Sequence, residues 1–426
     1  MQGFGRRGFG GLAISTGAGL GLAAFGARAQ APAQPAAPEI RLGALFPLTG
    51  PAGLFGDESF RGVELAVEER NAAGGVLGRS LRLVRADAPD EAAATAEARR
   101  LSQGADRVTA ILGSFSTAIA LPASQVAELA GLPYFELGAI GDAVMERNFR
   151  WVFRVAPRAQ DFAATALDGV ALLAASLTRS PESLRLAIAQ EDALGPQSVA
   201  AAQEALAAER RLTLVQRATY APRPTDLAAL VQRLRGLDAE VVLHAGAPGD
   251  EILLFRAMRD ANWRPRMVIG TAGGYGLAET ARSIGADFAG TMSADFTPSA
   301  VNERVAPGAR AYAEAYLRRY GADPRSGHGL ACFTGTRIVL DALQRAGSTE
   351  RDRIRAAVLA TDIPEGSTAS GWGARFDERG QNLRARPVLC QWQPAPAAPG
   401  SPPGLRQVVI APAEAAVAEA LGRLGL

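Results

Sequence analysis

Three hydroxyl residues, Ser114, Ser116 and Thr117, offer the clearest binding chemistry in this sequence. They follow the apolar run Val108–Leu112, which is typical of a buried strand, and they precede a helical pattern with Pro122 in or near its first turn. Hydroxyls and free backbone N–H groups at the start of a helix form an anion site. The three residues therefore either bind an anionic group of a ligand or only cap the helix, since both roles use the same geometry.

Catalytic chemistry has less support. His328 and Cys332 stand four residues apart, on one face of a helix, but two ligands do not make a metal site. A simpler explanation places His328 on the surface of the helix and Cys332 in the core. The chain has no lysine and no Gly-x-Ser-x-Gly run, which excludes a P-loop lysine, a Schiff-base lysine and Ser-Lys catalysis. We predict no catalytic residues, no metal and no cofactor, and an enzyme remains the less favoured alternative.

Three residues with reactive side chains are each open to two interpretations. His244 ends an apolar run, so it either faces a cleft or, as is more common, is a hydrogen-bonded structural histidine. Cys332 and Cys390 either form a disulfide in an oxidising compartment or remain buried free thiols. The sequence gives no distance between the two cysteines and leaves both interpretations open.

A strand, a loop, a helix and a second strand open the folded part of the chain. The run Ile40–Phe46 predicts a buried strand, a helix follows with Asp57 at its start, and Leu81–Val84 predicts the next strand. Glycines between residues 74 and 78 end the helix. The loop Leu48–Gly56 would then lie at the carboxyl end of its strand, where open α/β sheets bind ligands.

The same alternation continues along the chain and predicts parallel sheets covered by helices, two of them at a length of 426 residues. The tail beyond Gln393 is proline-rich and predicts a loop, followed by a terminal helix over Ala413–Leu424. The other expected strands are Val108–Leu112, Pro133–Glu136, Val152–Val155, Arg185–Ala189, Leu212–Thr219, Val241–His244 and Met267–Gly270, and the other expected helices are Ala92–Gln103, Pro122–Ala130, Phe162–Leu177, Val199–Glu209, Leu227–Leu237 and Glu251–Ala261.

The amino terminus predicts export. Arg6 and Arg7 precede a Gly- and Ala-rich apolar run that ends in a small-residue cleavage pattern at Ala27–Ala29. Paired arginines indicate the twin-arginine route, with an ordinary secretory leader as the alternative. We therefore assign residues 1–29 to a signal peptide and residues 30–38 to a disordered lead-in, and we expect a mature protein in the periplasm.

Charge and hydropathy exclude two classes of partner for the mature chain. The formal net charge is +2, and removing residues 1–29 takes away three arginines and no acid, which leaves −1. This balance provides no basic field for nucleic acid. No later apolar run in the sequence is long enough to span a membrane. We expect a soluble monomer that binds neither nucleic acid nor membrane.

Three runs carry a resemblance to a known family: LTGPAGLFGDESFRG, NAAGGVLGR and ILGSFSTAIALPASQVAELAGLPYF. In their order and spacing they resemble the periplasmic solute-binding proteins of ABC transporters for branched-chain amino acids, and the similarity extends from Glu39 to Gln393. The resemblance implies a two-lobe α/β fold in which the chain crosses between the lobes near Val155–Pro157, Met292–Thr297 and Phe376–Arg384. It also implies capture of a small solute by hinge closure and delivery to a membrane permease.

The implied lobes are discontinuous in sequence. Lobe 1 would comprise residues 39–156 and 293–376, and lobe 2 residues 157–292 and 377–426. The ligand-sensing component of a receptor shares this fold and is a second functional class. The second cysteine of the family's own disulfide would fall at Ser116, so that bridge is missing here.

For lobe 1 the resemblance implies that Thr117, with Ser116 beside it, receives a ligand carboxylate. Phe55 occupies the position of an aromatic residue that covers the ligand side chain, although packing against the first helix is the alternative. Relatives carry a threonine where this chain has Ile140, which leaves the backbone N–H groups of Ala139 and Gly141 as donors. A further residue of this region, Glu136, either lies near the cleft or, as is more common, pairs with an arginine at the surface.

For lobe 2 the resemblance implies departures from the family. Ala272 stands where relatives have the acid that receives a ligand ammonium, and Ala247 and Leu194 stand where they have aromatic residues. Tyr275, Glu191 and Asp192 are close enough in sequence to substitute. Because burying an ammonium without an acidic partner costs several kcal/mol, we predict a non-amino carboxylate or an amide-like solute in preference to leucine.

Overall fold

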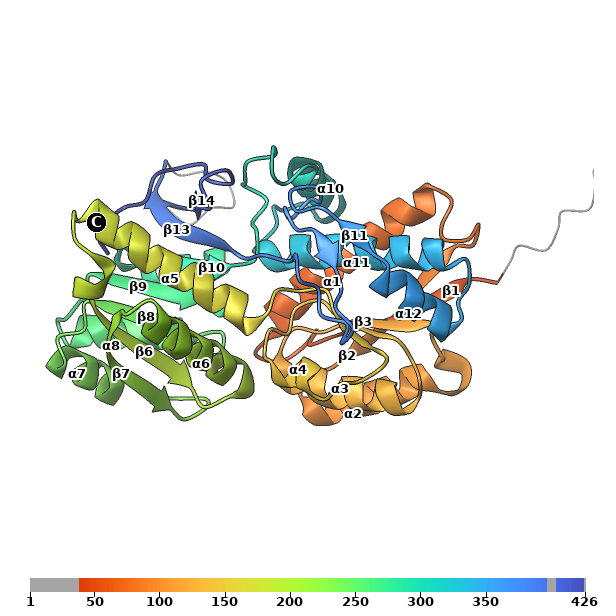
Figure 1. Ribbon diagram of the computed structural model, residues 1–426, viewed down its shortest axis with the longest axis horizontal. Coiled ribbons are helices and arrows are strands. Elements are labelled where there is room, and N and C mark those ends of the chain that lie inside the picture. Colours follow the sequence, from red (N-terminus) through yellow and green to blue (C-terminus); the bar gives the residue numbers. More distant parts are fainter. Residues whose placement is uncertain (1–37, 397–403, 425–426) are drawn as a thin grey trace, which may run out of the picture. The chain divides into compact units, whose positions relative to one another are not determined.

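A computed structural model of the protein describes residues 38–396 and 404–424. These residues form two large β-sheets flanked by helices (Figure 1). The predicted signal peptide and lead-in fall almost entirely outside the described residues. The first sheet has five strands in the order β2-β1-β3-β4-β5, and all its neighbours are parallel. Its strands are β1 Ile40–Phe46, β2 Leu81–Asp87, β3 Ala110–Gly113, β4 Tyr134–Glu136 and β5 Val152–Arg154.

The second sheet has seven strands in the order β14-β13-β10-β9-β8-β6-β7. The pairs from β7 to β10 are parallel, whereas β10 pairs with β13, and β13 with β14, in antiparallel register. The expectation of an entirely parallel sheet is therefore wrong for this one. Its strands are β6 Arg185–Glu191, β7 Thr213–Tyr220, β8 Val241–Ala245, β9 Met267–Thr271, β10 Met292–Asp295, β13 Val388–Pro394 and β14 Leu405–Ala411. A small antiparallel pair, β11 Asp362–Ile363 and β12 Ala374–Arg375, lies outside both sheets.

We use lobe 1 for the first sheet with its helices and lobe 2 for the second sheet with its helices. The helices packed with lobe 1 are α1 Gly53–Ala72, α2 Glu91–Ser102, α3 Thr117–Leu129, α4 Ala143–Glu146, α10 Ala309–Tyr320, α11 Gly327–Ala346 and α12 Arg351–Leu359, and those packed with lobe 2 are α5 Ala159–Ser176, α6 Leu194–Glu209, α7 Ala228–Gly236, α8 Asp250–Asp260 and α9 Ala278–Ile284. Short 3-10 turns are η1 Gly104–Asp106, η2 Pro181–Ser183, η3 Gly273–Gly276 and η4 Gly285–Phe288.

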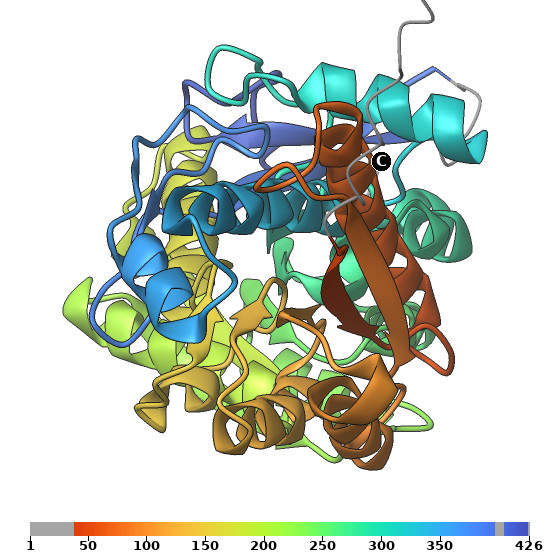
Figure 2. The same cartoon turned by 90° about the vertical axis from the view of Figure 1, so that its right-hand side faces the viewer.

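Both faces of the first sheet carry apolar residues, so the central strand β3 is buried along its whole length, whereas the edge strand β2 includes exposed arginines. Leu42 and Ala44 of β1 pack with residues of α1 and α11, while Leu45, on the opposite face, packs with α2 and α3. Figure 2 shows the orange helices α2 and α3 and the blue helix α11 on different sides of this sheet. Helices α1 and α11 approach so closely that a Cβ on Gly62 would lie 2.0 Å from the Gly329 carbonyl oxygen.

Helix α1 starts earlier than the sequence predicts. It begins at Gly53, and Asp57 lies in its second turn, where it forms ion pairs with Arg61 at 2.8 Å and Arg325 at 3.2 Å. Asp57 as the helix cap is therefore wrong. Helix α1 can start early because Gly56 has no side chain: a Cβ there would lie 1.8 Å from the Pro47 carbonyl oxygen. As a result, Phe55 belongs to the first turn of a helix rather than to a loop.

The carboxyl-terminal segment forms a strand where the sequence analysis predicts only a loop and a helix. Strand β14 is the edge strand of the second sheet and pairs with β13 along its length. Its Leu405 and the run Val408–Ile410 are buried, whereas Arg406 is exposed. The segment Ala413–Leu424 contains turns and bends instead of the predicted helix. It is held by side-chain bonds to β13, such as Leu421 N–H to Gln391 Oε1 at 2.8 Å.

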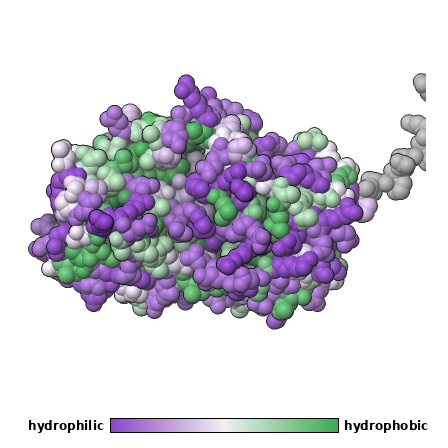
Figure 3. All heavy atoms as spheres, in the orientation of Figure 1, coloured by the Kyte–Doolittle hydropathy of each residue, from purple (hydrophilic) through white to green (hydrophobic). Residues whose placement is uncertain are grey.

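The chain passes between the two sheets after β5, after β10 and before β13. The predicted boundary at Ser293 falls inside β10, which pairs with β9 and β13. Cys332 in α11 and Cys390 in β13 are buried free thiols, so the disulfide alternative is wrong. Within the described part of the chain, no helix has the length and hydropathy to cross a bilayer. The face drawn in Figure 3 is mostly hydrophilic with scattered apolar groups.

Candidate ligand-binding site

The predicted hydroxyl loop lies at the carboxyl end of β3. Helix α3 begins at Thr117, so Pro122 falls in its second turn, and Ser116 is the N-cap whose Oγ accepts from Ile119 N–H at 3.4 Å. Capping, one of the two predicted roles, is therefore observed for Ser116. Thr117 is buried, and its Oγ1 accepts from Gly141 N–H at 3.1 Å. This bond joins the hydroxyl loop to the loop after β4.

Glu136, at the end of β4, joins the two loops through hydrogen bonds. Its buried carboxylate accepts from the backbone N–H groups of Ser114 at 2.8 Å, Gly138 at 2.9 Å and Ala139 at 2.7 Å. The hydroxyls of Ser114 and Tyr134 donate to its other oxygen at 3.1 and 2.9 Å. A buried carboxylate requires such donors. The favoured prediction, an arginine partner at the surface, is wrong, and the residue instead sets the shape of both loops.

This arrangement corrects the predicted donors of the second loop. The N–H of Ala139 donates to Glu136, and the N–H of Gly141 donates to Thr117, so neither is free in this conformation. Their places in the loop are as predicted, but their hydrogen-bonding capacity is used within the protein. The hydroxyls of Ser116 and Thr117 therefore remain the better candidates for contact with a ligand.

Arg154, at the end of β5, holds the same loop from the carbonyl side. Its buried guanidinium donates through Nη1 to the carbonyl oxygens of Ile140 at 2.9 Å and Gly141 at 2.8 Å. Burial lowers the pKa of Arg154 to about 10, and nearby carboxylates, among them Asp142 and Glu136, oppose that shift. The group is therefore charged at neutral pH. Sequence reasoning missed this residue because its run reads as an ordinary strand end.

An aromatic cluster lies behind the hydroxyl loop. Phe55 stacks on Phe115 with ring centroids 4.9 Å apart, and His328 packs edge-on against Phe55 at 5.0 Å and against Phe296 at 4.7 Å. Phe55 is only 1% exposed, whereas Phe115 is partly exposed. Burial lowers the pKa of His328 to about 3, so its ring is neutral, and its predicted place on a helix surface is wrong.

Phe115 was not among the predicted site residues, although it lies between two of the predicted hydroxyls. It is the more accessible ring of the stacked pair and the better surface for an apolar ligand body. The position of Phe55 supports the packing alternative, because the ring lies under Phe115. Phe115 could have been predicted from the sequence, because an aromatic residue between two hydroxyl residues of a ligand loop is a candidate for contact with a ligand.

In lobe 2, a buried polar network lies at the carboxyl ends of β7 and β8. His244 contacts the Tyr220 hydroxyl through Nε2 at 2.9 Å and the Tyr275 hydroxyl through Nδ1 at 2.6 Å. Tyr220 also donates to Asp250 Oδ2 at 2.9 Å, and Ala247 N–H donates to the same oxygen at 3.1 Å. Burial lowers the pKa of His244 to about 3. His244 is thus a hydrogen-bonded structural histidine.

The residues that could have replaced the missing acid differ in their positions. Tyr275 packs in the core of lobe 2, and Trp392 Nε1 donates to its carbonyl oxygen at 2.7 Å, so it does not substitute from a loop surface. Asp192 is exposed, and Glu191 is buried at the end of β6. Burial, followed by repulsion from Asp250, raises the pKa of Glu191. Leu194, the first residue of α6, is 46% exposed.

Ala272 adopts a strained backbone conformation. Its φ is +45°, in the left-handed region that disfavours residues with a Cβ, and its N–H donates to the Ala294 carbonyl oxygen at 2.8 Å. Such strain persists only where the surrounding structure enforces it, and it concentrates at functional sites. Here it lies on the loop after β9, where the resemblance implies a contact with the ligand.

The two loops of lobe 1 meet the first two turns of helices in lobe 2. Asp142 N–H donates to Ser198 Oγ of α6 at 3.2 Å, and Ala159 N–H of α5 donates to the Ile140 carbonyl oxygen at 3.0 Å. A Cβ on Gly195 would lie 3.3 Å from Thr117 Oγ1. The start of α6 therefore closes over the hydroxyl of Thr117.

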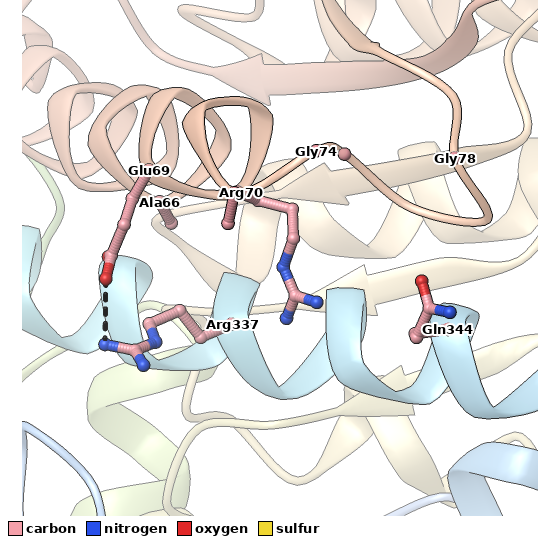
Figure 4. A pocket seen from close by; sticks show the side chains of 9 residues that line it. Ala66, Glu69, Arg70, Gly74, Gly78, Arg337 and Gln344 are labelled. Carbon is pink, nitrogen blue, oxygen red and sulfur yellow. Dashed lines mark ion pairs between the residues drawn. The ribbon is translucent and has the colours of Figure 1, made fainter.

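A cavity of 470 Å³ lies elsewhere, between α1 and α11 (Figure 4). Its charged side chains are neutralised, because Arg337 pairs with Glu69 at 3.6 Å and Arg70 pairs with Asp341. Ala66 and Ala73, Gln344 of α11 and the glycines of the turn after α1 also line it. The cavity is lined by the carboxyl-terminal part of α1, not by the strand ends where α/β sheets bind ligands.

Comparison with known proteins identifies the family. The model of the family described as periplasmic binding protein matches residues 39–389. The chain belongs to the periplasmic binding protein family. Among curated proteins, this periplasmic binding protein is 40% identical over 366 residues to the Leu/Ile/Val-binding protein homolog 7 of Brucella abortus, covering 85% of this chain and 92% of the relative. Homolog 8 of the same species is 40% identical over 357 residues, covering 83% and 88%.

Solved structures confirm the two-lobe fold. A leucine-binding protein of Thermotoga maritima superposes with a TM-score of 0.72 at 20% identity, covering 88% of this chain and 99% of that one. A branched-chain amino acid transporter substrate-binding protein of Streptococcus pneumoniae, in complex with isoleucine, gives a TM-score of 0.71 at 18% identity, covering 87% and 100%. At these identities the structures bear on the fold alone.

Proposed function

We propose that this periplasmic binding protein captures a small organic solute by hinge closure and delivers it to the membrane permease of an ABC importer. The proposal rests on one observation: the start of α6 in lobe 2 lies against the Thr117 hydroxyl of lobe 1. A ligand that contacts both sides stabilises the closed form, since only there do both sets of groups reach it. Permease recognition then depends on closure.

The proposed solute carries a carboxylate or amide and an apolar body. The hydroxyls of Ser116 and Thr117 suit an oxygen acceptor, and the half-buried ring of Phe115 beside them suits an apolar group. The relatives are named for leucine, isoleucine and valine, yet Ala272 provides no carboxylate for an ammonium. We therefore infer discrimination against α-amino acids. The proposal includes export to the periplasm, for which Arg6 and Arg7 indicate the twin-arginine route.

Three compounds with one carbon skeleton test the ligand class: L-leucine, 4-methylpentanoate and 4-methylpentanamide. Calorimetry should show the carboxylate or the amide binding more tightly than leucine by at least an order of magnitude. A bound compound at ~100 times its dissociation constant should add ~2.7 kcal/mol to the free energy of unfolding. Submicromolar binding of leucine would show that another acid receives the ammonium, and would overturn the ligand class.

The same samples test binding without turnover. After dissociation the compound should be recovered chemically unchanged, as judged by mass spectrometry, and small-angle scattering should show a more compact particle with ligand than without. Stoichiometric binding followed by chemical conversion would overturn the transport proposal in favour of an enzyme.

A further inference from the structure

Arg154 lies where the second ligand loop meets two of the segments that join the lobes. Its Nη1 donates to the carbonyl oxygens of Ile140 and Gly141, and its Nε donates to Gln381 Oε1 at 2.6 Å. Gln381 belongs to the segment that precedes β13, and Arg154 immediately precedes the first crossing. One guanidinium thus contacts both the ligand loop and a crossing.

The backbone of this region is joined as well. Arg154 N–H donates to the Gly380 carbonyl oxygen at 2.8 Å, and Asn382 N–H donates to the Arg154 carbonyl oxygen at 2.9 Å. Asn382 Nδ2 donates to the Val155 carbonyl oxygen at 3.0 Å. The approach requires a glycine, because a Cβ on Gly380 would lie 2.6 Å from the Val152 carbonyl oxygen. The first and third crossings therefore lie side by side and share hydrogen bonds.

We propose that Arg154 is a positioning residue that couples the ligand loop to the hinge through Gln381. Hinge closure changes backbone angles at a few residues of the crossings, and the planar guanidinium holds its acceptors in a fixed geometry. A displacement of the Ile140 and Gly141 carbonyls is therefore transmitted to Gln381. The Ile140 carbonyl also accepts from Ala159, the first residue of α5 in lobe 2, which extends the coupling to the other lobe. This inference rests on the proposed function.

Two substitutions at Gln381 separate coupling from simple packing. Gln381→Leu removes the side-chain oxygen that accepts from Arg154. It also removes the side-chain N–H groups that donate to the carbonyl oxygens of Ala156 and Asn382. Gln381→Glu keeps an acceptor for Arg154 but loses those donors. If the hydrogen bond to Arg154 couples the loop to the hinge, Gln381→Glu should have the same distribution of distances between the lobes as the wild type. If only the bonds donated by Gln381 are important, both variants should change that distribution to the same extent.

The readout is the distance between the lobes in the full mature chain. Spin labels on Leu129→Cys of α3, where the native side chain is 79% exposed, and on exposed Glu209→Cys of α6 report that distance by pulsed electron resonance. The native Cys332 and Cys390 are buried, so the added thiols take the labels. Without ligand, Gln381→Leu should broaden the distance distribution, and Gln381→Glu should keep the wild-type width. Equal widths in the wild type and Gln381→Leu would overturn the proposal.

Titration with 4-methylpentanoate and L-leucine adds a second measurement. For whichever compound the wild type binds, Gln381→Leu should lower the affinity about tenfold, and adding Arg154→Lys should cost little more, because both changes remove one coupling. Fully additive losses would contradict the proposal. If neither compound binds the wild type, 4-methylpentanamide takes their place; if that amide does not bind either, the ligand class fails, while the distance distributions still decide whether Arg154 couples loop and hinge.

Discussion

Single residues in this protein act mainly by holding backbone groups in place. Glu136 accepts from three backbone N–H groups and Arg154 donates to two carbonyl oxygens of the same region. Opposite charges on neighbouring strands, in register at β4 and β5, thus position one loop from both sides. Glu136 and Arg154 therefore act by fixing the conformation of the loop that contacts Thr117, and not by offering their charges to a ligand.

Thr117→Ala tests the hydroxyl directly. The substitution should weaken binding of 4-methylpentanoate by about 1.5–3 kcal/mol, the range for a hydrogen bond to a charged group, as measured by calorimetry. The matched control is Thr95→Ala in α2, a threonine outside the site whose hydroxyl donates to the Glu91 carbonyl oxygen at 2.9 Å, and it should leave the affinity unchanged. An unchanged affinity in Thr117→Ala would remove this residue from the site.

Asp295, at the end of β10, should make stability depend on pH. Burial raises its pKa from the ordinary 3.8 to about 7, so its stabilising contribution is fully present below about pH 4 and is lost as the pH rises through 7. Asp295→Asn stays neutral, and its unfolding free energy relative to the wild type should rise by roughly 2–4 kcal/mol between pH 4 and pH 8.

Chemical denaturation at the two pH values measures this difference. Asp323→Asn, an exposed control between α10 and α11, should change the unfolding free energy equally at both. An effect of Asp295→Asn that is the same at pH 4 and pH 8 would contradict the raised pKa.

At the level of elements, the packing of α1 on α11 depends on a glycine. Gly62→Ala would place a Cβ 2.0 Å from the Gly329 carbonyl oxygen, so the helices must separate, and we expect a loss of about 3 kcal/mol or more, since overpacking typically costs 1–3. Gly236→Ala in α7 is the control, because nothing lies within 4 Å of its Cβ. The control should be neutral or stabilise by up to about 1 kcal/mol; equal effects in urea unfolding would contradict this account.

The periodic elements could be predicted from sequence, whereas long-range contacts could not. Strand β1 and helix α5 follow local hydrophobic patterns, and the alternation along the chain predicted two sheets covered by helices. The arrangement in two lobes with three crossings came from the resemblance to the family, because the pattern of elements does not reveal it. Strand β14 was missed because the prolines between Gln393 and Leu405 predicted a loop, and its pairing with β13 is a contact that local sequence does not show. The role of Glu136 depends on donors from a loop 22 residues earlier, and such proximity is set by the sheet rather than by local sequence.

For the site, the loops could be predicted but not their internal bonds. Ser116 and Thr117 lie at the start of a helix after a strand, as the pattern indicates. The N–H of Gly141 is occupied by the Thr117 hydroxyl, which belongs to another element. The N–H of Ala139 is occupied by Glu136, whose carboxylate is turned back onto its own loop by further donors from Ser114 and Tyr134. Local sequence carries no information about such tertiary partners.

For the whole molecule, export can be tested with the leader intact. Replacing Arg6 and Arg7 by glutamine should retain the protein in the cytoplasm of a cell with a working twin-arginine pathway, because that route requires the paired arginines. Fractionation and amino-terminal sequencing should place the wild type in the periplasm, beginning near Gln30. Normal secretion of the double variant would assign the leader to the general route instead.

The order of elements along the chain sets a timetable for synthesis. The five strands of the first sheet are complete at Arg154, but α11, which covers one face of that sheet, begins only at Gly327. At 5–20 residues per second, roughly 170 intervening residues take roughly 9–35 s to emerge from the ribosome. During that interval α1 covers its part of this apolar face while α11 is still missing, so we expect the nascent chain to bind holding chaperones until α11 has been made.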